Sequence, residues 1–273
     1  MKPVYLRIII FNILIVFLLL AAVFVPVVLF ENIAAGAYLR MVAPMGIIVL
    51  LSIAGLDIYF WSNRRLVTLL AREDWPALAD YLETKVFTEG RYASRDIRIL
   101  AQAWLVQGKF ADVARLEAML AAGRPALLEE HALIFGAARV LSVNVSGGSY
   151  TGAAGFFRER LEKSRSARDV NAEWLRLYYG FSLMMAQSPI AAGIFGELAE
   201  GARDIIVAGL SAFFLSEHAG NAVAVAGRSR VRTIVKTAGN WEKKTAKLKA
   251  EVHGAIIRKY LDEAGAWVFG GQS

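Results

Sequence analysis

The chain has 273 residues, of which 56% are hydrophobic, and it carries a formal net charge of +7. Its mean hydropathy of +0.44 is too high for an ordinary soluble protein, and the excess lies in the first 61 residues, so we expect a membrane anchor followed by one further domain. The chain has no cysteine, which excludes disulfide bonds, thiolate zinc sites and iron–sulfur clusters.

Two apolar segments open the chain. Residues 8–30 are 23 positions without a charged side chain. At about 1.5 Å per residue this length exceeds the ~30 Å core of a bilayer. No small-x-small cleavage pattern follows, so we predict an uncleaved span. Residues 42–61 form a second predicted span. The anchor over residues 1–61 is therefore predicted to be a hairpin of two transmembrane helices.

The charges around the spans predict their orientation. Arg64 and Arg65 follow the second span, whereas the loop between the spans has Arg40 as its one basic residue. The positive-inside rule then places both termini in the cytoplasm. We expect the anchor to lie in a bacterial cytoplasmic membrane. Asp57 lies close in sequence to Trp61 and to both arginines. We interpret these four residues as a membrane-interface group and not as an ion or proton relay, since a relay normally has partners inside the membrane.

The stretch that follows predicts helices throughout. Residues 63–70 continue the apolar pattern without a breaker, which predicts that the second span runs unbroken into the next helix. Residues 94–127 predict two antiparallel helices around a turn at Gly108, because apolar side chains repeat at helical spacing on both sides of it. Ser94 and Asp96 are predicted to cap the first helix, and Gly123 with the proline two residues later is predicted to end the second.

This hairpin resembles a tetratricopeptide repeat, a helical pair of about 34 residues. The residues that match the first helix, the turn and the end of that unit are Leu100, Ala101, Trp104, Gly108, Phe110 and Pro125. Two positions on the second helix depart from the pattern. Val113 stands where a smaller residue is usual, and Glu117 stands where an aromatic residue is usual.

Similar units recur along the chain, with aromatic residues after the turns at Trp75, Phe110 and Tyr150. The resemblance implies an all-α fold in which three or four helical pairs stack as a tetratricopeptide-like α-solenoid over residues 62–220. Generic helical pairs without that family relationship are the alternative. The layout is also similar to bacterial inner-membrane proteins of the HemY-like type, which carry two N-terminal spans and a tetratricopeptide domain.

Two segments nearer the C-terminus have a composition of their own. Residues 205–215 are apolar, but their charged flanks leave too short a run for a span, so we predict a buried core helix. Residues 221–273 form a basic helical segment with ten Lys or Arg and four Asp or Glu, and its apolar tail at 266–269 is expected to dock back on the domain.

The basic segment has three interpretations: the solvated face of a capping helix, a contact with anionic lipid headgroups, or nucleic-acid binding. The expected membrane anchor favours lipid over nucleic acid. The candidate lipid contacts are Arg228, Arg230, Arg232, Lys243, Lys244 and Lys247.

No local catalytic or metal-binding pattern is present, because His131, His218 and His253 are far apart and lie in no known motif. We therefore expect no enzymatic activity and no cofactor. The predicted function is a scaffold that holds a partner protein at the membrane through its helical surface. The candidate partner-binding residues are Arg95, Arg98, Gln102, Arg176 and Tyr179.

Two other functions remain open. One is a structural subunit of a large envelope assembly, of the secretion, division or flagellar-motor type, in which the repeats pack against copies of themselves. The other is a small transport component, which would rest on Asp57 alone.

Overall fold

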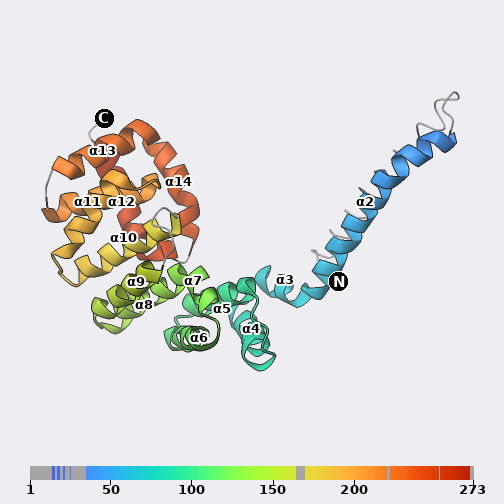
Figure 1. Cartoon of the computed structure of the whole chain (residues 1–273), viewed down its shortest axis with the longest axis horizontal. Coiled ribbons are helices and arrows are strands. Elements are labelled where there is room, and N and C mark those ends of the chain that lie inside the picture. Colours follow the sequence, from blue (N-terminus) through green and yellow to red (C-terminus); the bar gives the residue numbers. More distant parts are fainter. Residues whose placement is uncertain are drawn as a thin grey trace. The chain divides into compact units, whose positions relative to one another are not determined.

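The computed structural model describes residues 14, 15, 17, 18, 21, 25, 35–163, 170–219, 222–251 and 253–270 (Figure 1). Within these residues every regular element is helical, with about 14 α-helices and two short turns of other helix types. The prediction of an all-α fold is confirmed. The chain divides into two units between Asp74 and Trp75. The expected boundaries after residues 61 and 220 stay predictions.

The first unit contains α2 (Ala35–Ser62) and α3 (Arg64–Leu70). The second predicted span lies within α2, whereas the first, at 8–30, falls almost wholly outside the described residues. Among the residues that are described, no single helix is both long and apolar enough to cross a membrane. The segments Pro44–Tyr59 and Arg64–Leu70 meet that requirement only when taken together, and they are bent by 70°.

The expectation that the second span runs unbroken into the next helix is wrong, because the chain bends at Asn63. This residue has φ −103° and ψ 12°, outside the helical range. Its side-chain Nδ2 donates a hydrogen bond of 2.8 Å to the carbonyl oxygen of Tyr59. Asparagine competes in this way with the helical ladder, so it ends α2 without a proline or glycine.

The second unit begins with α4 (Trp75–Glu83) and a π-helical turn, η1 (Thr84–Thr88). The predicted hairpin follows as α5 (Ser94–Val106) and α6 (Phe110–Gly123), which confirms both helices. Gly108 between them has φ +70°, the left-handed conformation that the tight turn requires. Pro125 does not simply end α6, because it opens α7 (Pro125–Glu130) at a first-turn position that needs no N–H donor.

The predicted caps of α5 are wrong. The residue before the helix is Ala93, and no side chain caps it. Asp96 instead lies inside the first turn and is fully buried. Its Oδ2 is 2.5 Å from the Nζ of Lys85 on η1, so the carboxylate joins two neighbouring elements. A charge buried this deeply is tolerated only with such a partner.

The next elements continue as packed helical neighbours (Figure 1). They are α8 (Ala132–Ser146), α9 (Tyr150–Lys163), α10 (Val170–Met185), α11 (Ile190–Gly201), α12 (Ile205–Ala219) and α13 (Ala222–Val235). α12 is the central helix of this half, since it packs against α11, α13 and the last helix of the chain. Val207 and Leu210 on it are fully buried, which confirms the predicted core helix at 205–215.

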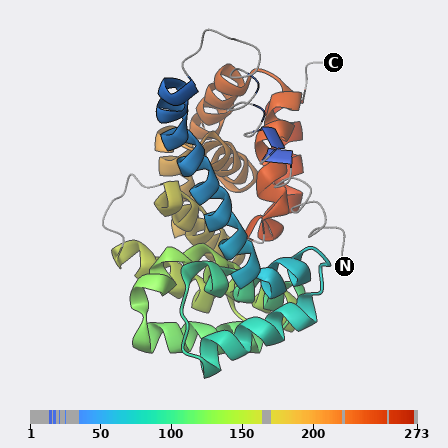
Figure 2. The same ribbon diagram turned by 90° about the vertical axis from the view of Figure 1, so that its right-hand side faces the viewer.

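The last elements fold back onto earlier helices. They are α14 (Ala238–Ala250), the 3₁₀ turn η2 (His253–Ile256) and α15 (Arg258–Phe269), drawn in red in Figure 2. η2 contacts α8, and α15 contacts α12 and α13. Val268 is fully buried, and the ring of Trp267 lies 6.1 Å from that of Phe213. The expected docking of the apolar tail is therefore confirmed.

Trp241 is the side chain through which α14 packs against the rest of the second unit. It is 2% exposed, and its Nε1 donates a hydrogen bond of 3.0 Å to the carbonyl oxygen of Leu261. A Cβ atom at Gly209 on α12 or at Gly265 on α15 would lie 2.8 Å from the indole ring. The two glycines therefore leave the space that the ring fills between their helices.

Candidate functional site

A groove of about 300 Å³ opens among α6, α8 and the start of α9. Val113 and Ala114 on α6, Val143 on α8 and Ala153 on α9 give it apolar walls. Glu117 on α6 and Arg139 on α8 supply its charged part. The groove therefore combines apolar surface with a single charge pair.

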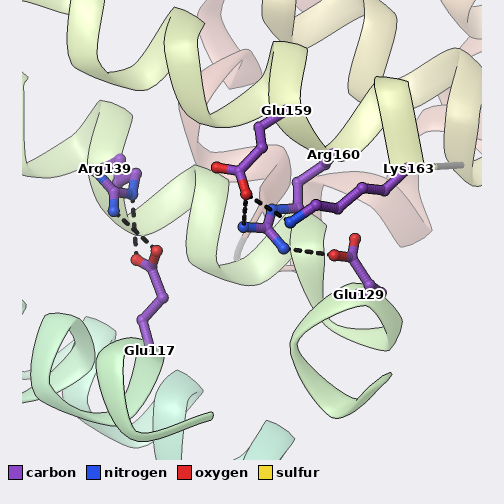
Figure 3. Close-up of polar contacts among 6 residues, drawn as sticks. All are labelled: Glu117, Glu129, Arg139, Glu159, Arg160 and Lys163. Carbon is purple, nitrogen blue, oxygen red and sulfur yellow. Dashed lines mark hydrogen bonds and ion pairs between the residues drawn. The ribbon is translucent and has the colours of Figure 1, made fainter. Parts of the chain in front are cut away.

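The charge pair in this groove is bidentate (Figure 3). Arg139 donates from Nη2 to one carboxylate oxygen of Glu117 at 2.8 Å and from Nε to the other at 3.1 Å. The guanidinium carbon also lies 5.0 Å from the centre of the Phe156 ring. The side chain of Arg139 stays 43% exposed, whereas that of Glu117 is 11% exposed. The groove thus presents a cation whose position is fixed by two partners but which solvent still reaches.

A second arginine reinforces the same region from α9. Arg160 is 7% exposed at its side chain and binds Glu129 on α7, while its Nη2 donates to Glu159 at 2.9 Å (Figure 3). Glu159 also accepts a hydrogen bond of 2.6 Å from Lys163, which lowers the pKa of its carboxyl group. The guanidinium of Arg160 lies 5.1 Å from the same Phe156 ring. This network links α7 to α9 and holds the aromatic ring beneath Arg139.

A larger cleft of about 590 Å³ lies where α10 ends, α11 begins and α12 ends. Met184, Phe195 and Phe214 line it with apolar and aromatic surface. Beside it, Met185 and Ile190 are 38% and 61% exposed. This end of the unit therefore carries apolar surface that water reaches.

The predicted partner-binding residues fall into two groups. Arg95, Arg98 and Gln102 share one face of α5, where Arg98 is exposed and the other two are partly exposed. Arg176 and Tyr179 lie on α10, five helices further along the chain. Arg176 pairs with Glu197 on α11, so its charge is already neutralised in part. A role for these five side chains in partner binding stays a prediction.

The three arginines predicted to contact lipid have partners within the second unit. Arg228 donates to the carbonyl oxygens of Val268 and Gly270, and Arg232 donates to the same two. These carbonyl groups end α15. Arg230 instead contacts α11, where it donates to the carbonyl oxygens of residues 199, 200 and 202 at the end of the helix. Cations placed here satisfy orphan carbonyl groups and offset the negative end of the helix dipole.

The three lysines of the same predicted group are arranged differently. Lys243, Lys244 and Lys247 lie on α14 with exposed side chains. Trp241 on the same helix is buried, and Lys243 and Lys247 lie roughly opposite to it, whereas Lys244 borders the buried side. Lipid contact stays a prediction for all six residues, and the structure leaves the lysines as its more accessible members.

The predicted membrane-interface group spans the junction of α2 and α3. Asp57, Trp61, Arg64 and Arg65 are all exposed within the first unit. The guanidinium of Arg64 lies 5.1 Å from the Trp61 ring, so these two side chains form a cation–π contact. Such a pairing is typical of residues near a polar–apolar boundary.

Ser94 and His131 approach one another, but not in the arrangement of a nucleophile and its base. The Ser94 hydroxyl donates to Glu130 at 2.5 Å. The Nε2 of His131 lies 3.0 Å from both the carbonyl oxygen and the Oγ of Ser94, so the imidazole is the donor. A nucleophilic serine requires the opposite direction of proton transfer. Within the described part of the chain, no group of three His, Asp or Glu side chains is placed to hold a metal ion.

These features define an all-helical protein whose helices pack in pairs with their neighbours. The chain belongs to the family described as "Uncharacterised Treponema protein", whose model matches residues 112–270, more than half of the chain. A protein of Treponema pallidum (strain Nichols), described as "Uncharacterized protein", is 28% identical over 224 residues, which cover 76% of this chain and 69% of that protein. No solved structure matches the chain. The family match includes the larger cleft, α14 and all of the lining residues of the groove except Phe110.

Proposed function

We propose that this protein is a non-catalytic, membrane-anchored scaffold that binds a partner protein through a tetratricopeptide-like helical surface. The first unit acts as the anchor, and the packed helical pairs of the second unit supply the binding surface. The groove among α6, α8 and α9 is the main contact, and the five residues on α5 and α10 extend it.

The exposed surface of α2 supports the anchor. Large apolar side chains of the helix are accessible, including Met45 (70%), Ile48 (63%), Leu51 (67%) and Ile58 (67%). At about 100° per residue these four positions form one broad apolar face. Exposure of such an apolar surface to water is unfavourable, whereas contact with lipid tails is not. The interface residues at the end of the helix fit the same location.

The observation that carries partner binding is the fixed, accessible Arg139 beside apolar walls. Glu117 and the Phe156 ring hold its guanidinium in place, so little side-chain entropy is lost when a ligand binds. The exposed edge of the Arg139 guanidinium still offers N–H donors to a carboxylate of the partner. The partner is therefore a protein segment that carries an acidic side chain next to an apolar one. Glu117 also explains the departure from the tetratricopeptide pattern, because its carboxylate serves Arg139.

In-membrane photo-crosslinking of the full chain tests this function. A photo-reactive amino acid is placed at Ser142, which lines the groove, or at Glu89, an exposed position outside it. Cross-linked products are identified by mass spectrometry. We expect a distinct partner to be captured from Ser142 and not from Glu89.

Matched variants then assign the contact. Arg139→Gln should reduce capture at least tenfold, whereas Arg158→Gln, an exposed arginine on α9, should leave it unchanged. Circular dichroism checks that both variants are folded. The Arg98→Ala and Gln102→Ala pair tests the extension of the surface on α5. Equal capture from Ser142 and Glu89 in a folded, membrane-bound protein would refute partner binding at this groove, and capture of this chain alone would instead support the structural-subunit function.

A further inference from the structure

The exposed face of α14 carries a cluster of lysines, which we call the α14 lysine surface: Lys243, Lys244 and Lys247. At about 100° per residue the three side chains lie within an arc of about 100° on the helix, and all three are exposed. The adjoining side is fixed in the unit by Trp241 and Leu248, both buried. Thr237 caps the helix by accepting a hydrogen bond of 3.2 Å from the backbone N–H of Asn240. The lysines therefore project from a rigid support.

Three other cations near this helix have partners within the unit. Lys249 lies 2.5 Å from Asp262, and Lys259 lies 3.6 Å from Glu263. Arg258 donates to the carbonyl oxygen of Lys249. By contrast, none of the three lysines of the α14 surface has an ion-pair partner among the residues that the structure describes. The α14 lysine surface thus differs from Lys249 and Lys259 in having no acidic partner within the described part of the chain.

We propose that the α14 lysine surface binds the anionic phospholipid headgroups of the membrane that holds the first unit. The proposal rests on the anchoring function above and names a second partner for it. Lysine is a compact, strongly hydrated point charge, which suits a fluid layer of phosphates without fixed geometry. Each such residue near an anionic leaflet strengthens binding roughly fivefold, so three are worth on the order of a hundredfold.

Two features favour lipid over nucleic acid as the occupant. Single-stranded nucleic acid is usually held by aromatic side chains between cations, but the residue between these lysines on the exposed face is Ala246. The chain also tethers the second unit to α2 by a short connection, since α3 ends at Leu70 and α4 begins at Trp75. A tether of this length keeps the local concentration of membrane surface high.

A single fluorophore on the full chain tests the proposal. The native sequence has no cysteine, so Ala246→Cys gives one labelling position on the exposed face. The labelled protein is reconstituted into vesicles of phosphatidylcholine alone or of phosphatidylcholine with phosphatidylglycerol. Both carry a small amount of lipid with a quenching nitroxide on its headgroup. We expect strong quenching in the anionic vesicles, weak quenching in the neutral ones, and a loss of the difference at high salt.

Charge-matched variants complete the test. The triple change Lys243→Gln, Lys244→Gln and Lys247→Gln should reduce the quenching to the neutral-vesicle level. A control that removes three exposed charges elsewhere, Arg91→Gln, Lys109→Gln and Arg158→Gln, should keep it. Equal quenching in both vesicle types, or an equal loss in the control, would overturn the proposal. So would release by inorganic phosphate or by duplex DNA at charge concentrations matched to the lipid.

The two proposals fail in different ways. Flotation of the protein with neutral vesicles reports the anchor and does not depend on the lysines. A chain that stays in the aqueous fraction refutes the anchor. In that case the lysine surface is tested by co-sedimentation of the same full chain with anionic vesicles, which the triple variant should abolish. Absence of co-sedimentation of the native chain then overturns the lysine proposal as well.

Discussion

Replacing Gly209 by alanine tests how closely α12 packs against α14. The new Cβ would lie 2.8 Å from Cη2 and 3.0 Å from Cζ3 of Trp241. Overpacking of this kind costs about 1–3 kcal/mol. Alanine returns about 1 kcal/mol because it favours the helix more than glycine does. We therefore expect the free energy of unfolding to fall by about 1 kcal/mol.

A second change isolates the cause. Trp241→Phe by itself should cost about 2 kcal/mol, because it leaves a cavity and removes the hydrogen bond to Leu261. Phenylalanine lacks the two ring atoms that the new Cβ would meet. In that background Gly209→Ala should therefore stabilise the protein by up to about 1 kcal/mol, giving a coupling energy of about 2 kcal/mol between the two sites.

The assay is urea unfolding of the full chain in detergent, followed by far-ultraviolet circular dichroism. Gly155→Ala serves as the control, since Gly155 lies on the exposed face of α9 with no atom near its would-be Cβ. It should stabilise the protein by up to about 1 kcal/mol in both backgrounds. The reasoning fails if Gly209→Ala in the native background stabilises the protein as much as Gly155→Ala does.

Two further predictions concern buried charges. Burial lowers the pKa of His131 and of His253 below 6.5, so as the pH falls below about 6.5 the unfolded chain takes up protons that the folded chain does not. The free energy of unfolding should therefore be highest above that pH and should decline below it. Urea titrations of His253→Gln at several pH values should show a shallower decline. Lys85→Met leaves Asp96 buried with only a long contact to Arg95 at 3.4 Å, and should cost about 3 kcal/mol in thermal or urea unfolding. Adding Asp96→Asn to it should recover most of that loss, and no recovery would show that Lys85 acts through packing.

Local patterns were sufficient to predict several elements. The apolar spacing on both sides of Gly108 predicts α5 and α6, because the turn and both helical faces are set by neighbouring residues. The charged flanks of 205–215 correctly predict a buried helix in place of a span. In each case the deciding information lies within a few turns of the element itself.

Other features depend on residues that are distant in sequence. Arg139 and Glu117 are 22 positions apart and meet only because α6 and α8 pack together, so neither stood out as a site residue. The basic segment shows the same limit. Composition treats Arg230 and Lys243 alike, but the guanidinium fork of the arginine reaches three backbone carbonyls while the lysine stays exposed. Asn63 breaks α2 through its own side chain, which hydrophobic periodicity does not register.

The packing of η2 against earlier helices has a consequence for folding during synthesis. The Tyr178 hydroxyl on α10 donates a hydrogen bond of 2.9 Å to the carbonyl oxygen of His253, 75 residues later. The ring of His253 also packs edge-on against Trp174 and Tyr178. A ribosome must therefore release the chain through η2 before this aromatic cluster is covered. Until then the aromatic cluster is incomplete, and a chaperone that shields aromatic surface would find its target during that interval.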